Sequence, residues 1–324
     1  MAVPPPDTPP PGALAAGRAA DADRSDPPPD TRCGFVAVVG APNVGKSTLV
    51  NGIVGSKVSI VSPKAQTTRF RVIGIVNRDR TQLLLVDTPG LFQPRKQFDR
   101  ALVSAAWRGM ADADVRLMLV DSRRGIDPAC EEVVGWLKAQ SRQAILVLNK
   151  IDLVAKPALL RLVGDLTSAD VFSDTFMISA RTGDGVDDLV RHIAGRLPAG
   201  PWLYPADDLS DLPNAMLAAE ITREQVFWQL QDEIPYAIAV ETESWREQDN
   251  GSVRIEQTIF VERPTQRAIV LGRSGEQIRR IGERARLELE RLLDRRVHLF
   301  LHVRVWKTWR QDRAFLTRQH MDAE

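Results

Sequence analysis

The sequence of 324 residues contains very little cysteine and histidine. Its two cysteines, Cys33 and Cys130, exclude a disulfide framework, and the four histidines are too scattered to suggest a metal cluster. A chain of this kind suits a reducing compartment. No apolar run approaches the roughly 18 residues that a membrane span needs, and the N-terminus lacks the basic and then apolar order of a signal peptide. We therefore expect a cytoplasmic protein.

Large apolar side chains are almost absent from residues 1–32, which instead hold nine of the 21 prolines. Such a segment cannot bury enough surface to offset the entropy that ordering costs. We expect residues 1–32 to be a disordered tail. The remaining length is sufficient for about two domains with apolar cores of their own.

Net charge is also small, at +1, but it is unevenly distributed. Residues 263–318 contain fifteen Lys or Arg against six Asp or Glu, so the rest of the chain is acidic. A basic region on an otherwise acidic chain favours an anionic partner. A solvated helical face with interspersed salt bridges would give the same composition, because Glu283, Glu288 and Glu290 lie among the arginines.

Residues 33–198 alternate short apolar runs with segments of helix length. The runs 35–39, 83–86, 115–120, 144–148 and 176–178 are typical of buried strands, which predicts a mostly parallel sheet with helices on both faces. Residues 71–76 and 81–86 are separated by a short polar turn and predict an antiparallel hairpin on that sheet. The fold class expected here is α/β.

Prolines and glycine between 198 and 205 break regular structure, and we expect a linker over residues 199–212. Residues 213–324 predict a second, α+β domain. A helix is expected at 214–230, a hairpin within 236–261 turning at Asn250-Gly251, a helical region at 276–293 broken near Gly282, and a strand at 297–305.

The octet GAPNVGKS matches the phosphate-binding pattern GxxxxGK[ST] and lies between a predicted strand and a predicted helix. Its glycines allow backbone N–H groups to point at phosphates, Lys46 can neutralise the β and γ oxygens, and the Ser47 hydroxyl can bind Mg²⁺. The α/β domain is therefore expected to be a P-loop NTPase domain. We expect a nucleoside triphosphate to contact the whole octet: Gly40, Ala41, Pro42, Asn43, Val44, Gly45, Lys46 and Ser47.

A second motif, Asp87-Thr88-Pro89-Gly90, closes the predicted strand 83–86. Asp87 can reach the Mg²⁺ ion through water, and the Gly90 N–H can contact the γ-phosphate. The polar segment 62–69 precedes this motif and is expected to be a switch that orders with the nucleoside triphosphate. We expect Thr68 to bind Mg²⁺ there, with Thr67 as the alternative.

A third motif, Asn149-Lys150-Ile151-Asp152, follows the predicted strand 144–148 and indicates guanine. The Asp152 carboxylate can accept hydrogen bonds from N1–H and the exocyclic amine of guanine, which adenine does not offer. Asn149 and Lys150 would brace the loop and cover the base. Ser179-Ala180 at the end of the last strand can add a backbone N–H to the guanine oxygen.

Together, PNVGKS, the Gln-Thr-Thr-Arg stretch, DTPG and NKID resemble the Era-type GTPases, over about residues 34–320. The resemblance draws attention to Leu91, because Ras-like enzymes use a glutamine there to orient the attacking water. Hydrolysis should therefore be slow or assisted. In related GTPases an asparagine that matches Asn43 recruits K⁺. We therefore expect catalysis to rest on Lys46, Thr68, Asp87, Gly90 and, as a hypothesis, Asn43 with K⁺.

The basic region contains a GxxG loop at residues 272–275 between an apolar segment and a helix. Two glycines let a nucleic-acid strand approach the backbone closely, and the module resembles the type II KH domain that closes Era proteins. Bases would face Ile269, Val270 and Ile278. We expect RNA contacts from Gly272, Arg273, Ser274, Gly275, Ile278, Arg279, Arg280, Lys307 and Arg310.

Residues 306–310 interleave tryptophan with basic side chains, which could stack on bases or pack the end of the module. Both interpretations stay open from the sequence alone.

The resemblance implies a GTPase with GTP or GDP and Mg²⁺ that couples its nucleotide state to binding of the 3′ region of small-subunit (16S) ribosomal RNA, in 30S assembly and maturation. It also implies peripheral contact with the inner membrane, and nothing in the sequence demands more than a monomer. One alternative is a GTPase of tRNA modification or large-subunit assembly. Another is a GTP-gated RNA scaffold with negligible turnover.

Overall fold

The computed structural model describes residues 30–64, 67–91 and 97–318. They form two compact units, and each unit is assembled from two separate stretches of the chain. The first unit joins residues up to Val58 with Thr68–Asp211, and the second joins Ser59–Thr67 with the chain from Leu212 onward. All but the last three residues of the predicted tail 1–32 lie outside the described residues.

The first unit is built on a six-stranded sheet in the order β2-β3-β1-β4-β5-β6. The predicted hairpin is confirmed, since β2 and β3 pair antiparallel, whereas all other neighbours are parallel. The strands are β1 (Arg32–Val39), β2 (Val72–Arg78), β3 (Thr81–Asp87), β4 (Val115–Asp121), β5 (Ala144–Asn149) and β6 (Phe172–Met177).

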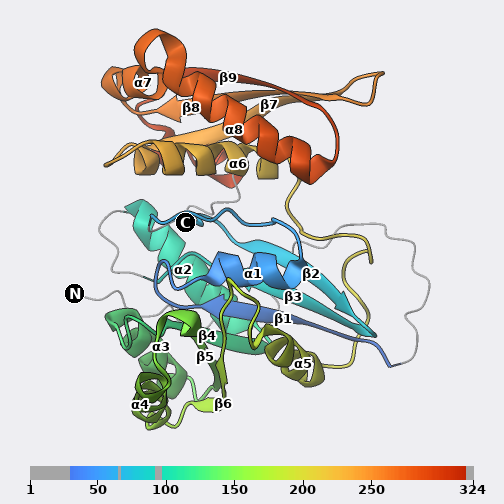
Figure 1. The fold of residues 1–324 in the computed structure, drawn as a ribbon, viewed down its shortest axis with the longest axis vertical. Helices are drawn as coiled ribbons and strands as arrows, with labels where there is room; N and C mark the ends of the chain where they lie inside the picture. Colours follow the sequence, from blue (N-terminus) through green and yellow to red (C-terminus); the bar gives the residue numbers. More distant parts are fainter. Residues whose placement is uncertain (1–29, 65–66, 92–96, 319–324) are drawn as a thin grey trace. The chain divides into compact units, whose positions relative to one another are not determined.

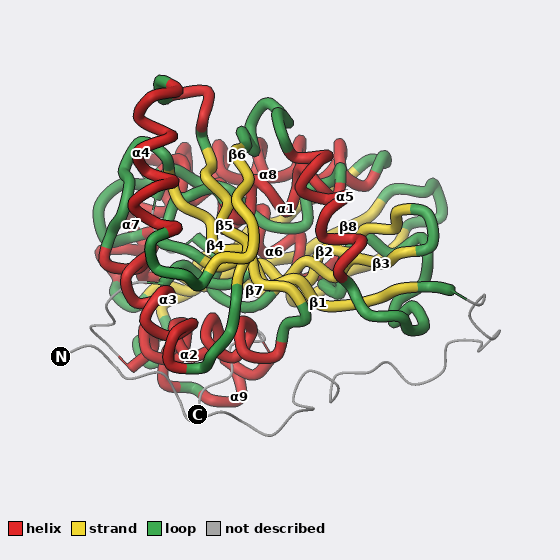
Figure 2. Tube along the Cα trace, turned by 90° about the horizontal axis from the view of Figure 1, so that it is seen from below, coloured by secondary structure: helices red, strands yellow, loops and turns green. Residues whose placement is uncertain are grey.

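Helices cover both faces of this sheet, with α1 and α5 on one side and α2 and α3 on the other (Figures 1 and 2). The helices are α1 (Lys46–Val54), α2 (Gln97–Asp112), α3 (Pro128–Ala139), α4 (Lys156–Thr167) and α5 (Val186–Arg196), with a short 3₁₀ turn η2 (Ile151–Leu153). Because both faces are covered, β3, β4 and β5 are buried along their whole length. The predicted α/β class is confirmed.

The sheet order also fixes where a ligand can bind. Strand β1 lies between β3 and β4: the connection after β1 leads to β2 and β3 on one side of it, and the connection after β3 leads to β4 on the other side. In such sheets, ligands bind at the carboxyl ends of the strands beside this reversal. The octet that begins at Gly40 follows the carboxyl end of β1 directly.

The second unit contains a three-stranded sheet, in the order β7-β8-β9, with β7 antiparallel and β9 parallel to β8. This confirms the predicted hairpin around Asn250-Gly251 and the α+β class. The elements are α6 (Asn214–Gln229), η3 (Pro235–Ala237), β7 (Ile238–Glu247), β8 (Val253–Val261), α7 (Pro264–Leu271), η4 (Arg273–Gly275), α8 (Glu276–Leu293), β9 (Val297–Val305), η5 (Trp309–Gln311) and α9 (Arg313–Arg318).

Helices α6, α7 and α8 pack on this sheet around an apolar core that includes Ile238, Ile259, Val270 and Ile281. The predicted break near Gly282 is wrong, because α8 runs without interruption from Glu276 to Leu293. A Cβ at Gly282 would lie 3.3 Å from the Leu301 side chain on β9. The glycine therefore allows close packing of helix on strand within a continuous helix.

Residues 199–211, for which a linker was expected, pack against the first unit. The Ile75 N–H donates to the Leu209 carbonyl at 2.9 Å, and the Ile73 N–H donates to Asp211 Oδ1 at 2.9 Å. These bonds use backbone groups of β2, the edge strand of the sheet. Among the described helices, none has both the length and the apolar character needed to cross a bilayer.

Candidate functional site

The phosphate-binding octet forms the turn between β1 and α1. Gly45 caps α1 in a left-handed conformation with φ +105°, and a Cβ there would lie only 2.3 Å from Asn149 Nδ2. That amide group donates to the Val44 carbonyl at 2.8 Å, so the octet is tied to the loop after β5. Only glycine satisfies both the backbone conformation and this close approach.

Lys46 begins α1, and its side chain is buried. Its Nζ donates to the carbonyls of Gly40 and Ala41 at 3.1 and 3.0 Å, which places the ammonium group inside the octet. Burial lowers the pKa of Lys46 to about 8, although the carboxylates of Asp87 and Asp127 oppose the shift. Phosphate oxygens beside Nζ would favour its charged form.

Three oxygen-bearing side chains meet at the start of α1. Ser47 Oγ donates to Asp87 Oδ2 at 2.7 Å and lies 3.1 Å from Thr68 Oγ1, which is itself 3.5 Å from Asp87 Oδ2. Hydroxyl and carboxylate oxygens are the ligands that Mg²⁺ accepts, directly or through water. The structure therefore groups the three residues predicted to hold the metal.

The neighbouring Thr67 has different contacts. Its Oγ1 lies 2.7 Å from Ser62 Oγ and donates to the Lys64 carbonyl at 2.9 Å, within the segment that belongs to the second unit. Of the two candidate threonines, only Thr68 contacts Ser47 and Asp87 among the described residues.

The Asp-Thr-Pro-Gly motif leaves β3 beside the octet. Thr88 Oγ1 donates to the Val38 carbonyl at 2.9 Å, and the Leu91 N–H donates to the Gly40 carbonyl at 3.1 Å. A Cβ at Gly90 would lie 2.9 Å from the Pro42 backbone, so the two loops touch at a glycine. The Leu91 side chain is only 1% exposed and offers no polar atom to an attacking water.

The Asn149 side chain connects the three loops of a nucleotide site. Besides its bond to Val44, its Oδ1 accepts from the N–H groups of Lys150 and Ala180 at 2.8 and 2.9 Å. These contacts join the octet, the loop after β5 and the loop after β6. They agree with the bracing role predicted for Asn149.

Asp152 lies on the short turn η2 after β5, and Arg181 Nη2 donates to its Oδ2 at 2.7 Å. A hydrogen bond from Ser179 and the nearby Arg181 charge lower the pKa of Asp152, although desolvation opposes them. The carboxylate is thus ionised and able to accept from guanine, as the base-recognition hypothesis requires.

Sequence reasoning missed Asp121, which ends β4 and whose side chain is 5% exposed. Its Oδ2 accepts from Lys150 Nζ at 2.7 Å, and the same ammonium group donates to the Asn43 carbonyl at 2.6 Å. Lys150 therefore spans from the octet to β4. The sequence signal that could have indicated Asp121 as a site residue was a carboxylate directly after the apolar run 115–120.

In the second unit, the GxxG loop connects α7 to α8. Gly272 and Gly275 have φ values of +73° and +77°, and Ser274 between them is also left-handed, at +51°. Arg273, Arg279 and Arg280 are exposed around this turn. Their side chains are in a position to contact a phosphate backbone.

The side chains predicted to face bases fall into two groups. Ile269 is 49% exposed and Ile278 is partly buried, but Val270 is fully buried in the core of the unit. The prediction that Val270 faces a base is therefore wrong. Residues 269 and 270 are neighbours on α7, where successive side chains point about 100° apart, so one lies outside and the next inside.

Residues 306–310 pack against the end of the second unit. Trp309 is fully buried, and the Trp306 ring lies edge-on to Phe260 and Phe315. Arg310 pairs with Glu262 at 3.2 Å and also donates to the Tyr236 carbonyl. Of the two interpretations, the geometry favours packing for the tryptophans. Lys307 is exposed, and RNA contact from Lys307 or Arg310 stays a prediction.

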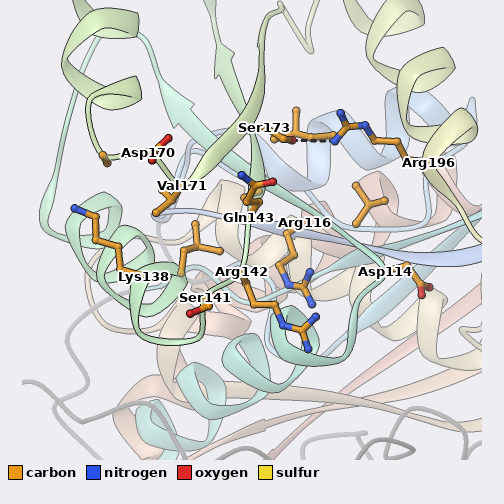
Figure 3. A pocket seen from close by; sticks show the side chains of 15 residues that line it. Asp114, Arg116, Lys138, Ser141, Arg142, Gln143, Asp170, Val171, Ser173 and Arg196 are labelled. Atoms are coloured by element: carbon orange, nitrogen blue, oxygen red, sulfur yellow. Dashed lines mark hydrogen bonds between the residues drawn. The ribbon is translucent and has the colours of Figure 1, made fainter.

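A depression in the first unit lies far from the nucleotide loops (Figure 3). Its lining comes from the amino ends of β4, β5 and β6, whereas the octet and the base-recognition loop follow carboxyl ends of strands. Figure 3 shows the guanidinium groups of Arg116 and Arg142 side by side at this end of the sheet. The depression cannot be part of the nucleotide site.

Two matches to known protein families agree with the nucleotide site in the first unit and the GxxG loop in the second. Residues 35–150 match the family described as 50S ribosome-binding GTPase, and residues 233–310 match the KH domain family. The chain is thus a P-loop GTPase whose second unit is a KH domain.

Similarity to individual proteins shows to which family of P-loop GTPases the chain belongs. GTPase Era of Afipia carboxidovorans is 55% identical over 282 residues, which cover 87% of this chain and 92% of that protein. GTPase Era of Caulobacter vibrioides is 48% identical over 301 residues, which cover 89% of this chain and 95% of that protein. The chain belongs to the GTPase Era family.

A solved structure of Era in complex with MgGDPNP and nucleotides 1506–1542 of 16S ribosomal RNA superposes with a TM-score of 0.85 and 37% identity. A structure of an Aquifex aeolicus Era variant bound to GDP and aluminium fluoride gives the same values. Each covers 90% of this chain and 100% of its own chain.

Proposed function

We propose that this GTPase binds the 3′ region of 16S ribosomal RNA through its KH domain and acts in assembly and maturation of the 30S subunit. The observation that carries the proposal is the GxxG loop with the exposed Arg273, Arg279 and Arg280 around it, in a chain that belongs to the GTPase Era family. The Era complex with 16S ribosomal RNA supports this partner, because that protein matches 90% of the chain.

In the nucleotide site, we propose direct Mg²⁺ ligation by the hydroxyls of Ser47 and Thr68, with Asp87 acting through water. Their mutual distances of 2.7 to 3.5 Å support this ligand set. Bound Mg²⁺ would offset the negative charge of the β and γ phosphates. Lys46 would contact the same phosphates, and Asp152 would select guanine.

Hydrolysis is proposed to be slow without assistance, because the buried Leu91 side chain cannot orient water. The Asn43 hypothesis supplies one form of assistance, through a bound K⁺ ion. Lys150 supports the backbone at Asn43, which has a left-handed φ of +65°. Single-turnover hydrolysis should be faster in K⁺ than in Na⁺ buffer. Equal rates in the two buffers would remove K⁺ from the proposal.

The RNA partner is tested by crosslinking in cells and sequencing of the bound RNA. We expect reads from the 3′ region of 16S ribosomal RNA. Gly275→Asp should abolish these reads and leave GTP affinity unchanged, because an acidic side chain would repel the phosphates beside the loop. Loss of GTP affinity as well would contradict independent sites.

Gly251→Asp is the matched control for this variant. Gly251 has a φ of +78°, close to that of Gly275, and lies in the β7–β8 turn of the same unit with open space around a Cβ. The control therefore introduces the same charge and the same backbone strain away from the loop, and RNA binding should persist. Reads from tRNA or large-subunit RNA would instead support a role in tRNA modification or large-subunit assembly.

The scaffold alternative predicts GTP binding with negligible turnover. Single-turnover measurements with and without the recovered RNA separate it from an RNA-responsive enzyme, which should hydrolyse GTP faster with RNA.

We further propose a cytoplasmic monomer with peripheral contact to the inner membrane, on the basis of the family resemblance. Cell fractionation and sedimentation of the purified chain test these two points.

A further inference from the structure

The depression at the amino ends of β4, β5 and β6 is a feature of the first unit that the nucleotide site does not use. It has a volume of about 910 Å³, and all the residues that line it belong to the first unit. Sites for small molecules have volumes of this order. The depression is therefore large enough to hold a small ligand.

Arg116, on β4, lines this depression although it is only 7% exposed. Its Nε donates to the Met110 carbonyl at 2.8 Å, and its Nη2 donates to the Ala111 carbonyl at 3.1 Å. Both carbonyls lie in the last turn of α2, where they lack partners within the helix, so the two bonds hold the guanidinium group in place. No described residue forms a hydrogen bond with Arg116 Nη1.

Arg142 brings a second guanidinium group to the same part of the depression (Figure 3). Its backbone lies in a tight turn after α3, in which its N–H donates to the Leu137 carbonyl at 3.0 Å. The Arg142 side chain is exposed, and it forms no hydrogen bond with any residue that the structure describes. Capping of α2 explains the position of Arg116 but does not explain why Arg142 lies beside it.

Two other charged residues that line the depression already have partners. Arg196 forms an ion pair with Asp174 at 2.6 Å. Asp114 Oδ2 accepts from the Phe35 N–H at 2.8 Å, which ties this carboxylate to β1. These contacts leave the two guanidinium groups without an ion pair in the part of the chain that the structure describes.

Lys138 and Asp170 also line the depression, and Figure 3 shows both on a different side of it from the two guanidinium groups. The charge that faces the ligand space beside Arg116 and Arg142 is therefore positive. Burial, followed by the Arg142 charge, lowers the pKa of Arg116, whereas Asp114 and Asp112 raise it. An arginine nevertheless stays charged at neutral pH.

A phosphate monoester is the anion that best suits two adjacent guanidinium groups. At neutral pH it carries nearly two negative charges and has three oxygens that accept hydrogen bonds. It can accept from both groups at once, whereas a carboxylate has one charge and two oxygens, which a single guanidinium fork engages. We propose that Arg116 and Arg142 form a second anion site, which binds the phosphate group of a small phosphate monoester in the depression.

The test is a titration of the full chain saturated with GDP and Mg²⁺, so that the nucleotide loops are already occupied. The probe is methyl phosphate, and nitrogen-15 NMR of the arginine side chains measures its binding. We expect saturable shifts. Arg142→Gln should weaken this binding about tenfold or more, as expected for the loss of a charged hydrogen bond, and should leave GDP affinity unchanged.

Arg161→Gln is the matched control. Arg161 is exposed on α4 in the same unit and does not line the depression. The control removes the same charge elsewhere, so binding of methyl phosphate should persist. An equal loss of binding in both variants would indicate an effect of net charge alone and would overturn the site.

Dimethyl phosphate distinguishes a monoester from the RNA backbone, because it is a diester with one negative charge. We expect it to bind at least about tenfold more weakly than methyl phosphate. Equal binding of the two would refute the monoester assignment in favour of a backbone contact. Tighter binding of a 5′-phosphorylated RNA oligonucleotide at this site would assign the phosphate to an RNA end and overturn the small-molecule ligand. Unchanged binding in Arg142→Gln, or no saturation up to about 10 mM methyl phosphate, would overturn the anion site itself.

Discussion

Lys46 makes nucleotide binding dependent on pH in a direction that the structure fixes. Its pKa is lowered to about 8 by burial, from an ordinary value of 10.5, so the neutral form gains population above pH 8. Phosphates favour the charged form. We therefore expect a nucleotide to bind together with a proton at alkaline pH, and its affinity to fall as the pH rises.

The size of this loss of nucleotide affinity follows from the same two pKa values of Lys46, about 8 and 10.5. With a pKa of about 8 in the free protein, Lys46 is roughly 10% neutral at pH 7.0 and roughly 75% neutral at pH 8.5. Full return of the pKa to 10.5 would correspond to about 3.4 kcal/mol of coupling between proton and nucleotide. Between pH 7.0 and 8.5, only about a fourfold loss of affinity should be visible.

Nucleotide affinity falls with pH, whereas the stability of the nucleotide-free protein should rise with pH. Because the folded pKa lies below the unfolded one, the unfolded state binds more protons between pH 8 and 10.5. The free energy of unfolding therefore rises with pH through that window, as far as Lys46 contributes to it.

Titration calorimetry of GDP binding, in two buffers of different ionisation enthalpy, measures the proton directly. We expect uptake of about 0.75 proton per GDP at pH 8.5 and about 0.1 at pH 7.0. The range ends at pH 8.5 so that the N1–H of guanine stays protonated. Uptake below about 0.2 proton at pH 8.5 would refute the lowered pKa.

Lys64→Met is the control, because burial also lowers the pKa of Lys64, which belongs to the second unit and donates to the carbonyls of Phe227 and Leu230. Removing this second lysine should leave the proton uptake with GDP unchanged. A fall in uptake would mean that Lys46 is not the source of the proton.

Three further substitutions test the nucleotide site. Asp152→Asn should shift preference from guanine to xanthine nucleotides in competition binding, and unchanged guanine selectivity would remove Asp152 from base recognition. Gly45→Ala should weaken GDP binding about tenfold or more, since its Cβ would meet Asn149 at 2.3 Å, while Gly135→Ala, with open space around it, should not. Asp121→Asn should weaken GTP and GDP equally, by about tenfold, through the lost charge beside Lys150, and a larger effect on GTP would contradict this.

The strands of the first unit could be predicted because parallel buried strands leave a strong sequence signal. Both faces of β4 are covered, so every residue from Val115 to Val120 except Arg116 is apolar. Arg116 is nevertheless buried, and its guanidinium donates to the carbonyls of Met110 and Ala111. The loops of the nucleotide site could then be predicted as well, because they come directly after the carboxyl ends of these strands.

Asp121 and Gly282 show where this reasoning fails. A single carboxylate after a strand is common, and its role depends on the lysine that reaches it from the next strand. Gly282 resembles a helix break in sequence, yet the helix continues because β9 fills the space of the missing side chain. In both cases the deciding neighbour is far away along the chain.

Thr67 and Thr68 present the same problem at one peptide bond. Both follow a polar segment without periodicity, so residue type cannot distinguish them. Their contacts can, because the Thr67 hydroxyl closes a turn with Ser62 and Lys64, whereas the Thr68 hydroxyl lies beside Ser47. The Thr67 carbonyl also accepts from Arg223, which is 156 positions further along the chain. A local pattern cannot encode contacts between residues so far apart in sequence, so the choice between the two threonines becomes clear only in the folded structure.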